Sequence, residues 1–154
     1  MELIAQLQIL GEVGLAMLLG GLIGLEREAA SKPAGFRTNM LVAGTAALLV
    51  GLSAGLLRYF SEFSAGETLS ADPIRIVHAI VIGISFLGAG TIIRRREGKS
   101  IEGLTTAASI LLSAAVGIAV ALKLYLLAAG TTLLAFLVLK LFGLLEVKIR
   151  NRGS

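Results

Sequence analysis

The chain has 154 residues, of which 56% are hydrophobic, with a mean hydropathy of +0.89 and a net charge of +4. The hydrophobic share and the mean hydropathy lie far above those of an ordinary soluble domain, so they favour a membrane protein. A chain of this length leaves almost no room for a soluble domain beside the membrane helices. Cysteine is absent, which excludes a disulfide framework, a thiolate nucleophile and a Cys-based zinc site.

Five apolar stretches predict five membrane-spanning helices. Each has about nineteen to twenty-three residues, enough for a helix to cross ~30 Å of hydrocarbon. They cover 3–25, 38–57, 74–93, 104–122 and 124–142. We therefore expect an all-α transmembrane domain over 1–145, a short basic cytoplasmic tail over 146–154, and no soluble C-terminal domain.

The basic residues predict an orientation for this bundle. All but three of the fourteen Lys and Arg residues fall in the segments 26–37 and 94–103 or in the tail from Lys140. By the positive-inside rule these segments are cytoplasmic, so the N-terminus is outside and the C-terminus inside. The net positive charge is then explained by topology and anionic lipid, and we expect no nucleic-acid partner.

The first helix ends, and the second begins, with charged and hydroxyl side chains. Glu26, Arg27 and Glu28 close the first span, while Arg37 and Thr38 open the second. A tight turn between them predicts an ion pair from Arg37 to one of the two glutamates. Such a pair is either a structural staple or part of a gate or ligand site, since ionisable groups near the membrane interior are costly.

Glycines at four-residue spacing predict close helix packing. Gly20 and Gly24 have this spacing, and small residues let membrane helices approach each other. They pack either within one monomer or at the seam of a homodimer. Gly35 belongs to the turn that follows.

The third span is rich in glycine. Gly83, Gly88 and Gly90 each weaken a helix by ~1 kcal/mol relative to Ala, so this helix is predicted to be kinked or broken, unless the glycines form a smooth packing face.

The outer end of the third span carries three ionisable residues. Asp72 precedes the helix, and Arg75 and His78 follow on nearly one face. They either pack and cap the helix or form a polar track for a proton or ion, which Glu12 of the first span could face.

The fourth span opens with Gly103, followed by Thr105 and Thr106. The two hydroxyls are expected to cap free backbone N–H groups or to help bind an anion or carboxylate there.

No enzyme motif is present. The chain has no supported Ser/His/Asp arrangement and no phosphate loop, and its single His excludes a multi-His metal site. We therefore expect neither an enzyme, nor a cofactor, nor a metal centre.

Two blocks carry the most specific pattern in the chain: GGLIGLEREAASKPAGFRTNMLV and DPIRIVHAIVIGISFLGAGTIIRRREGKSIEGLTTAAS. Both closely resemble the signature blocks of the MgtC/SapB family of bacterial inner-membrane proteins, and together they cover the first four spans. The family's recurrent features fall here on Gly24, Glu26, Arg27, Glu28, Pro33, Ala34, Gly35, Arg37, Thr38, Asp72, Pro73, Arg75, Gly83, Phe86, Leu87, Gly88, Ala89, Gly90, Gly103, Leu104, Thr105, Thr106 and Ala107.

The resemblance implies a multi-pass protein of the bacterial inner membrane. It further implies roles in growth at low magnesium, in survival of pathogens inside macrophages, and in modulation of the F-type ATP synthase. The chain departs from the virulence-associated members: Thr105 replaces their Asn, Leu111 and Leu112 replace their Trp and Cys, and the ACT-like domain of many members has no counterpart after Glu146.

Two functions stay open from the sequence. The protein either regulates other membrane complexes or ion homeostasis by contact, or moves an ion or small solute along a polar path between its helices.

Overall fold

The computed structural model describes residues 3–63, 73–94 and 101–150. Five helices and one two-residue antiparallel ladder make up this part of the chain: α1 (Leu3–Ala29), α2 (Phe36–Phe63), α3 (Pro73–Gly90), β1 (Ile93–Arg94), β2 (Ile101–Glu102), α4 (Leu104–Ala121) and α5 (Tyr125–Arg150). The predicted all-helical class and the helix count are confirmed. The short ladder, in which Ile93 lies opposite Glu102, was not expected.

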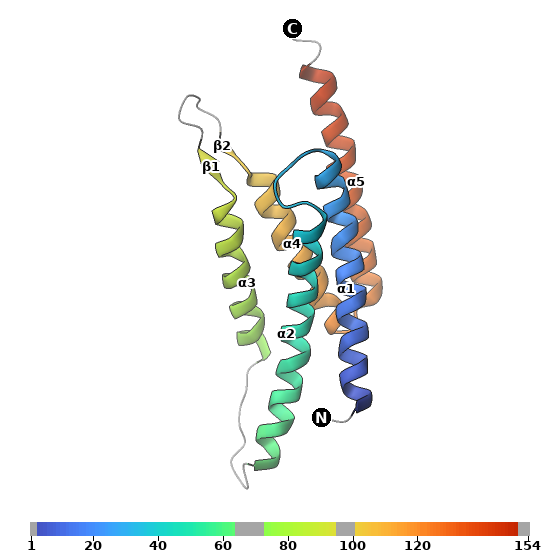
Figure 1. Cartoon of the computed structure of the whole chain (residues 1–154), viewed down its shortest axis with the longest axis vertical. Helices are drawn as coiled ribbons and strands as arrows, with labels where there is room; N and C mark the ends of the chain where they lie inside the picture. Colours follow the sequence, from blue (N-terminus) through green and yellow to red (C-terminus); the bar gives the residue numbers. More distant parts are fainter. Residues whose placement is uncertain (1–2, 64–72, 95–100, 151–154) are drawn as a thin grey trace.

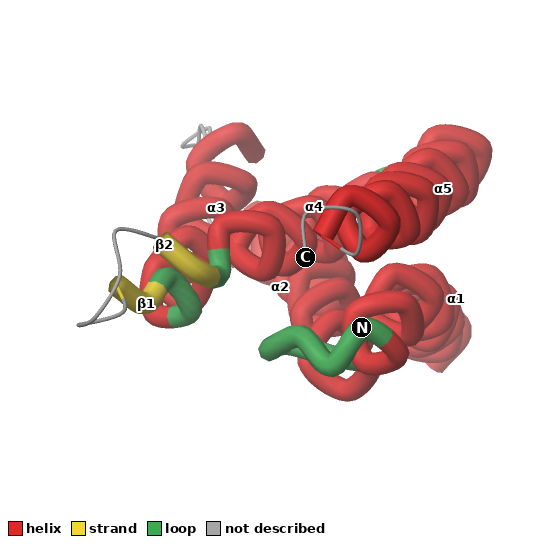
Figure 2. Tube along the Cα trace, turned by 90° about the horizontal axis from the view of Figure 1, so that it is seen from above, coloured by secondary structure: helices red, strands yellow, loops and turns green. Residues whose placement is uncertain are grey.

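The helices run alongside one another as an elongated bundle (Figure 1). The α1–α2 turn, the ladder and the C-terminal end of α5 lie at one end of the bundle, and the N-terminal end of α1 lies at the other. We call the first the turn end. Viewed along the long axis, α2 and α4 lie in the middle, with α3 on one side and α1 and α5 on the other (Figure 2). α4 contacts each of the other four helices.

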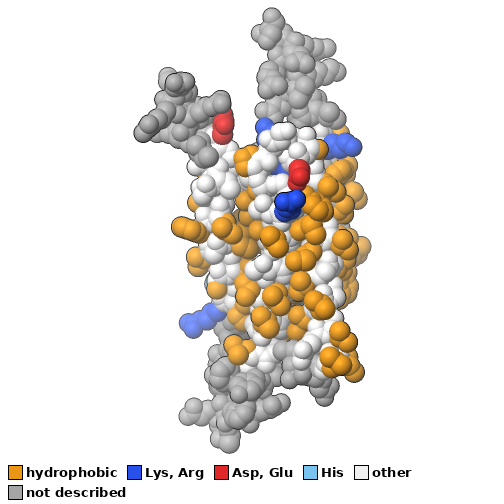
Figure 3. All heavy atoms as spheres, in the orientation of Figure 1, with side chains coloured by type: hydrophobic (Ala, Val, Ile, Leu, Met, Phe, Trp, Pro, Cys, Tyr) orange, Lys and Arg blue, Asp and Glu red, His pale blue; other side chains and the backbone are white. Residues whose placement is uncertain are grey.

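Three helical segments in the described part of the chain are long and apolar enough to cross a membrane: Leu3–Ala29, Phe36–Leu57 and Leu104–Ala121. The apolar stretches of α3 and α5, Ile74–Gly90 and Tyr125–Leu141, are shorter. Large apolar side chains point outward from the bundle, with Phe86 81% and Leu126 90% exposed. They cover the middle of the face seen in Figure 3, while charged side chains lie toward the two ends. This surface suits lipid, and the chain is a membrane protein.

Small side chains form the core. One buried cluster joins α1, α2, α4 and α5, and most of its buried residues are alanines: Ala16, Ala43, Ala47, Ala128 and Ala135. The other joins α2, α3 and α4, and there Ala46 and Ala114 pack with Val42, Ile80, Ile84 and Ile110. Helices with such contacts approach one another closely, which provides van der Waals packing where lipid removes the hydrophobic drive.

The predicted close packing of glycines occurs within the monomer. A Cβ at Gly20 would lie 2.5 Å from the Asn39 carbonyl oxygen, and one at Gly24 would lie 2.7 Å from the Gly35 carbonyl oxygen. Both glycines therefore face α2 of the same chain. The idea that this seam forms a dimer interface is wrong, because α2 already occupies it.

The predicted break in the third helix is also wrong. α3 is α-helical without interruption from Pro73 to Gly90, through Gly83 and Gly88. Glycine weakens a helix but keeps its backbone N–H, so the hydrogen bonds of the helix remain available. A Cβ at Gly88 would touch Ala107 of α4 at 3.5 Å, whereas Gly83 and Gly90 have no described neighbour within 4 Å of such a Cβ. The alternative of a packing face therefore holds for Gly88 alone.

Candidate functional site

A buried arginine joins the first helix to the fourth at the turn end. Arg27 lies in the last turn of α1 and is only 5% exposed. Its Nη2 donates a hydrogen bond of 3.1 Å to Oγ1 of Thr106, in the first turn of α4 and 79 residues away. A guanidinium stays charged at every relevant pH, so its burial requires polar partners.

A second buried hydrogen bond joins the second helix to the fourth. Asn39 is fully buried, and its Nδ2 donates to the carbonyl oxygens of Ala34 at 2.7 Å and Gly35 at 3.0 Å. Its Oδ1 accepts a hydrogen bond of 2.8 Å from the hydroxyl of Ser113. One side chain thus closes the α1–α2 turn and fastens it to α4.

Ser109 lies between these two contacts on α4, buried, and its hydroxyl donates to the Thr106 carbonyl oxygen at 2.8 Å. We call these five residues the inner polar cluster: Arg27, Asn39, Thr106, Ser109 and Ser113. Its side-chain hydrogen bonds join α1 and α2 to α4, and it contains one permanent positive charge.

Two buried polar atoms beside this cluster have no hydrogen-bond partner among the described residues. They are Nε of Arg27 and Oε2 of Glu26. One is a donor and the other an acceptor. Unused hydrogen-bonding capacity at membrane depth is costly, and it marks the part of the cluster most open to a functional role.

The predicted ion pair of Arg37 is wrong. Oε2 of Glu28 accepts a hydrogen bond of 2.8 Å from the backbone N–H of Phe36, the first residue of α2. The carboxylate therefore satisfies a free N–H at the positive end of that helix. Arg37 and Thr38 are exposed, and within the described chain no ion pair holds Arg37.

The two threonines at the start of α4 do not cap it as expected. The N-cap is Gly103, in a left-handed conformation with φ 93°, and no side chain caps the helix there. A Cβ at Gly103 would overlap the Thr91 carbonyl oxygen, which explains the need for glycine at this position. Thr106 belongs to the inner polar cluster and Thr105 is exposed.

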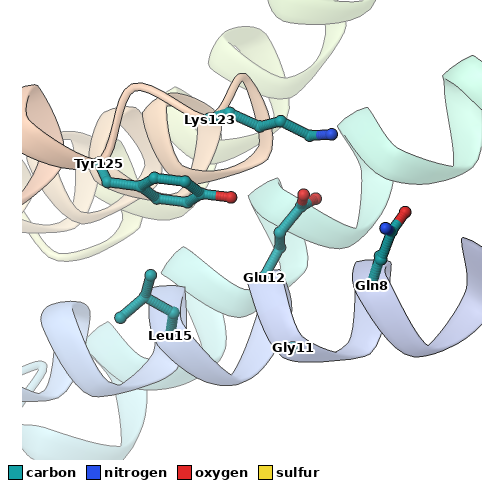
Figure 4. A pocket seen from close by; sticks show the side chains of 6 residues that line it. All are labelled: Gln8, Gly11, Glu12, Leu15, Lys123 and Tyr125. Atoms are coloured by element: carbon teal, nitrogen blue, oxygen red, sulfur yellow. The ribbon is translucent and has the colours of Figure 1, made fainter.

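The outer residues lie apart from this cluster. Asp72 is outside the described residues, and Arg75 and His78 are exposed in the first turns of α3, at the opposite end of the bundle from the turn end (Figure 1). Glu12 does not face them. It points toward the α4–α5 turn, near Lys123 and Tyr125 (Figure 4). The structure therefore divides the predicted polar residues between two ends.

Sequence reasoning missed Asn39, Ser109 and Ser113. The available signal was weak but present, because a polar amide in an otherwise apolar membrane span usually finds a partner on another helix. No three His, Cys, Asp or Glu side chains come together as metal ligands in the part of the chain that the structure describes.

The fold and the site define a class of protein: a helical membrane bundle with small residues at its helix contacts. At one end it holds a buried polar cluster that contains one arginine. The family model described as the MgtC family matches residues 13–148. The chain belongs to the MgtC family.

Curated relatives agree with this assignment. The chain is 35% identical over 144 residues to the "Putative magnesium transporter YhiD" of Escherichia coli K12, covering 90% of this chain and 62% of the relative. It is 47% identical over 103 residues to protein MgtC of Brucella abortus, covering 67% and 38%, and 36% identical over 117 residues to protein SapB of Bacillus subtilis, covering 76% and 49%. The chain thus spans about half the length of the curated relatives it matches. No solved structure matches it.

Proposed function

We propose that this chain is a membrane domain of the bacterial inner membrane that supports magnesium homeostasis by contact with other membrane proteins. Membership of the MgtC family and the names MgtC and magnesium transporter among the relatives support the link to magnesium. The proposal includes a virulence role and the F-type ATP synthase as a partner, because the family resemblance implies them. It also includes a homodimer, because the bundle is small.

The inner polar cluster is the observation that favours contact over cation transport. Its guanidinium is buried and joins α1 to α4, and a fixed positive charge in a medium of low dielectric constant repels a second cation. The amide of Asn39 and the hydroxyl of Ser113 already bond to each other. These groups favour a fixed helix arrangement at the turn end, which suits a contact surface better than a cation path.

Transport stays the second candidate, because one observation favours it. Ionisable groups kept inside a membrane protein often mark a solute pathway, and here Arg27 Nε and Glu26 Oε2 are buried without a partner among the described residues. The positive charge of Arg27 makes an anion the better cargo on this reading.

Growth at low magnesium tests the proposed role. Expressed in a bacterium from which its own MgtC-family protein has been deleted, the chain should restore growth in medium with micromolar magnesium. Arg27→Ala should remove this rescue because it disrupts the cluster, and Lys32→Ala, an exposed charge in the α1–α2 turn, should preserve it. Growth no better than with an empty plasmid would contradict the proposal.

The orientation of the bundle is tested by labelling single cysteines, since the chain has none of its own. Lys32→Cys at the turn end and Lys123→Cys at the opposite end are both exposed positions. By the positive-inside rule, a membrane-impermeant maleimide added to intact spheroplasts should label position 123 and leave position 32 unlabelled until the membrane is opened. The reverse pattern would place the N-terminus inside.

A further inference from the structure

An open hollow lies at the end of the bundle away from the inner polar cluster. It has a volume of about 300 Å³ and is lined by Gln8, Gly11, Glu12, Leu15, Lys123 and Tyr125 (Figure 4). α1 supplies the first four of these residues, and the α4–α5 turn and the start of α5 supply the other two. None of them takes part in the magnesium-related proposal above.

The hollow presents two opposite charges that do not pair with each other. The Glu12 carboxylate points into the space between the Tyr125 hydroxyl and the Lys123 ammonium (Figure 4). Among the residues that the structure describes, neither the carboxylate nor the ammonium has a hydrogen bond or an ion pair. Glu12 is also partly buried, and a membrane protein keeps such a charge at a cost unless something compensates it.

Lys123 lies in the turn that ends α4. Lys123 has a left-handed conformation with φ 62°, uncommon for a residue with a side chain. Its N–H donates to the Val120 carbonyl oxygen at 2.8 Å, and the N–H of Leu124 donates to that of Ala119 at 2.9 Å. These two hydrogen bonds form a Schellman motif, in which a helix commonly ends with a left-handed residue. The turn thus places Lys123 at the hollow that Glu12 also lines.

Exposed apolar side chains lie in the elements that form the hollow. Leu15 lines the hollow, and Leu122 and Leu126 of the adjoining turn and helix are 54% and 90% exposed. A ligand bound here would therefore have its polar part in the hollow and apolar surface beside it. A phospholipid has such a polar head group and such apolar acyl chains.

We propose that the hollow binds a head group in which an ammonium stands next to a phosphate, as in phosphatidylethanolamine. Glu12 accepts the ammonium, while Lys123 and the Tyr125 hydroxyl donate to the phosphate. The acyl chains lie along the exposed leucines. The phosphate of an anionic lipid such as phosphatidylglycerol also pairs with Lys123 and Tyr125, but this lipid has no ammonium for Glu12, so the carboxylate is the group that selects the zwitterion.

Native mass spectrometry of the full chain, released from mild detergent in the presence of equal amounts of the two lipids, tests this proposal. Wild type should retain phosphatidylethanolamine about fivefold over phosphatidylglycerol (~1 kcal/mol). Glu12→Gln should abolish the preference but keep lipid binding. Lys123→Gly, which suits the left-handed backbone, should lower binding of both lipids. Lys32→Ala, an exposed charge at the turn end, should change neither.

Addition of soluble glycerophosphoethanolamine, a head group without acyl chains, distinguishes binding of the head group alone from binding of the whole lipid. Displacement of the lipid at millimolar concentration would show that the head group alone suffices, and retention of the lipid would show that the acyl chains contribute; both support the site. Equal retention of the two lipids by wild type, or an unchanged preference in Glu12→Gln, would overturn the proposal.

Discussion

Replacing Arg27 by alanine is expected to be among the most damaging single changes in the chain. The substitution removes the hydrogen bond to Thr106 and the positive charge beside the buried Glu26 carboxylate. Loss of one partner from a buried charged contact leaves the other uncompensated, so we expect the free energy of unfolding to fall by ~3 kcal/mol. Unfolding titrations with sodium dodecyl sulfate in mixed micelles would measure it.

Matched variants make this prediction specific. Arg37→Ala and Lys32→Ala remove the same charge from exposed positions in the same region, and each should cost less than ~1 kcal/mol. Thr106→Val keeps the shape of the side chain but removes the acceptor, and it should cost ~1–3 kcal/mol. If Arg27→Ala proved no worse than Arg37→Ala, the inner polar cluster would have no structural role.

Replacing Gly117 by alanine is expected to have the other large effect. Its Cβ would overlap the carbonyl group of Ala43, which belongs to the backbone of α2 and cannot turn aside. α2 and α4 would have to separate, and both buried clusters depend on their contact. We expect a loss of at least ~2 kcal/mol in the same titration.

Gly83 is the matched control for this change. It also lies within a helix, but a Cβ there has no described neighbour within 4 Å. Gly83→Ala should therefore be neutral or should stabilise the protein by up to ~1 kcal/mol through helix propensity. Equal damage from both substitutions would mean that Gly117 does not mark a close backbone approach.

The sequence was sufficient for the helices and the family because those signals are local. Each apolar stretch predicts its own helix, and the two signature blocks are contiguous. Partner choice is not local: three arginine or lysine residues lie within 26–37, and nothing in their spacing distinguishes the buried Arg27 from the exposed Arg37. That distinction depends on the rotation of α1 against α4, which side-chain packing determines.

Glycine illustrates the same limit. Gly20, Gly83 and Gly117 are all helical, and by propensity they are equivalent. Only the neighbours differ: Gly20 and Gly117 meet backbone carbonyls of α2, while Gly83 faces no described atom. The sequence therefore predicted that glycines matter for packing without showing which of them do. It missed Asn39 for a related reason, because its partner Ser113 lies 74 residues away.

The proposal that the chain acts by contact and does not conduct magnesium can be tested in liposomes. The purified chain would be reconstituted with a magnesium-sensitive dye inside, and a magnesium gradient and a membrane potential would be imposed. We expect uptake equal to that of protein-free liposomes, for wild type and for Arg27→Ala alike. Magnesium uptake that requires the wild-type chain and is altered by Arg27→Ala would contradict it.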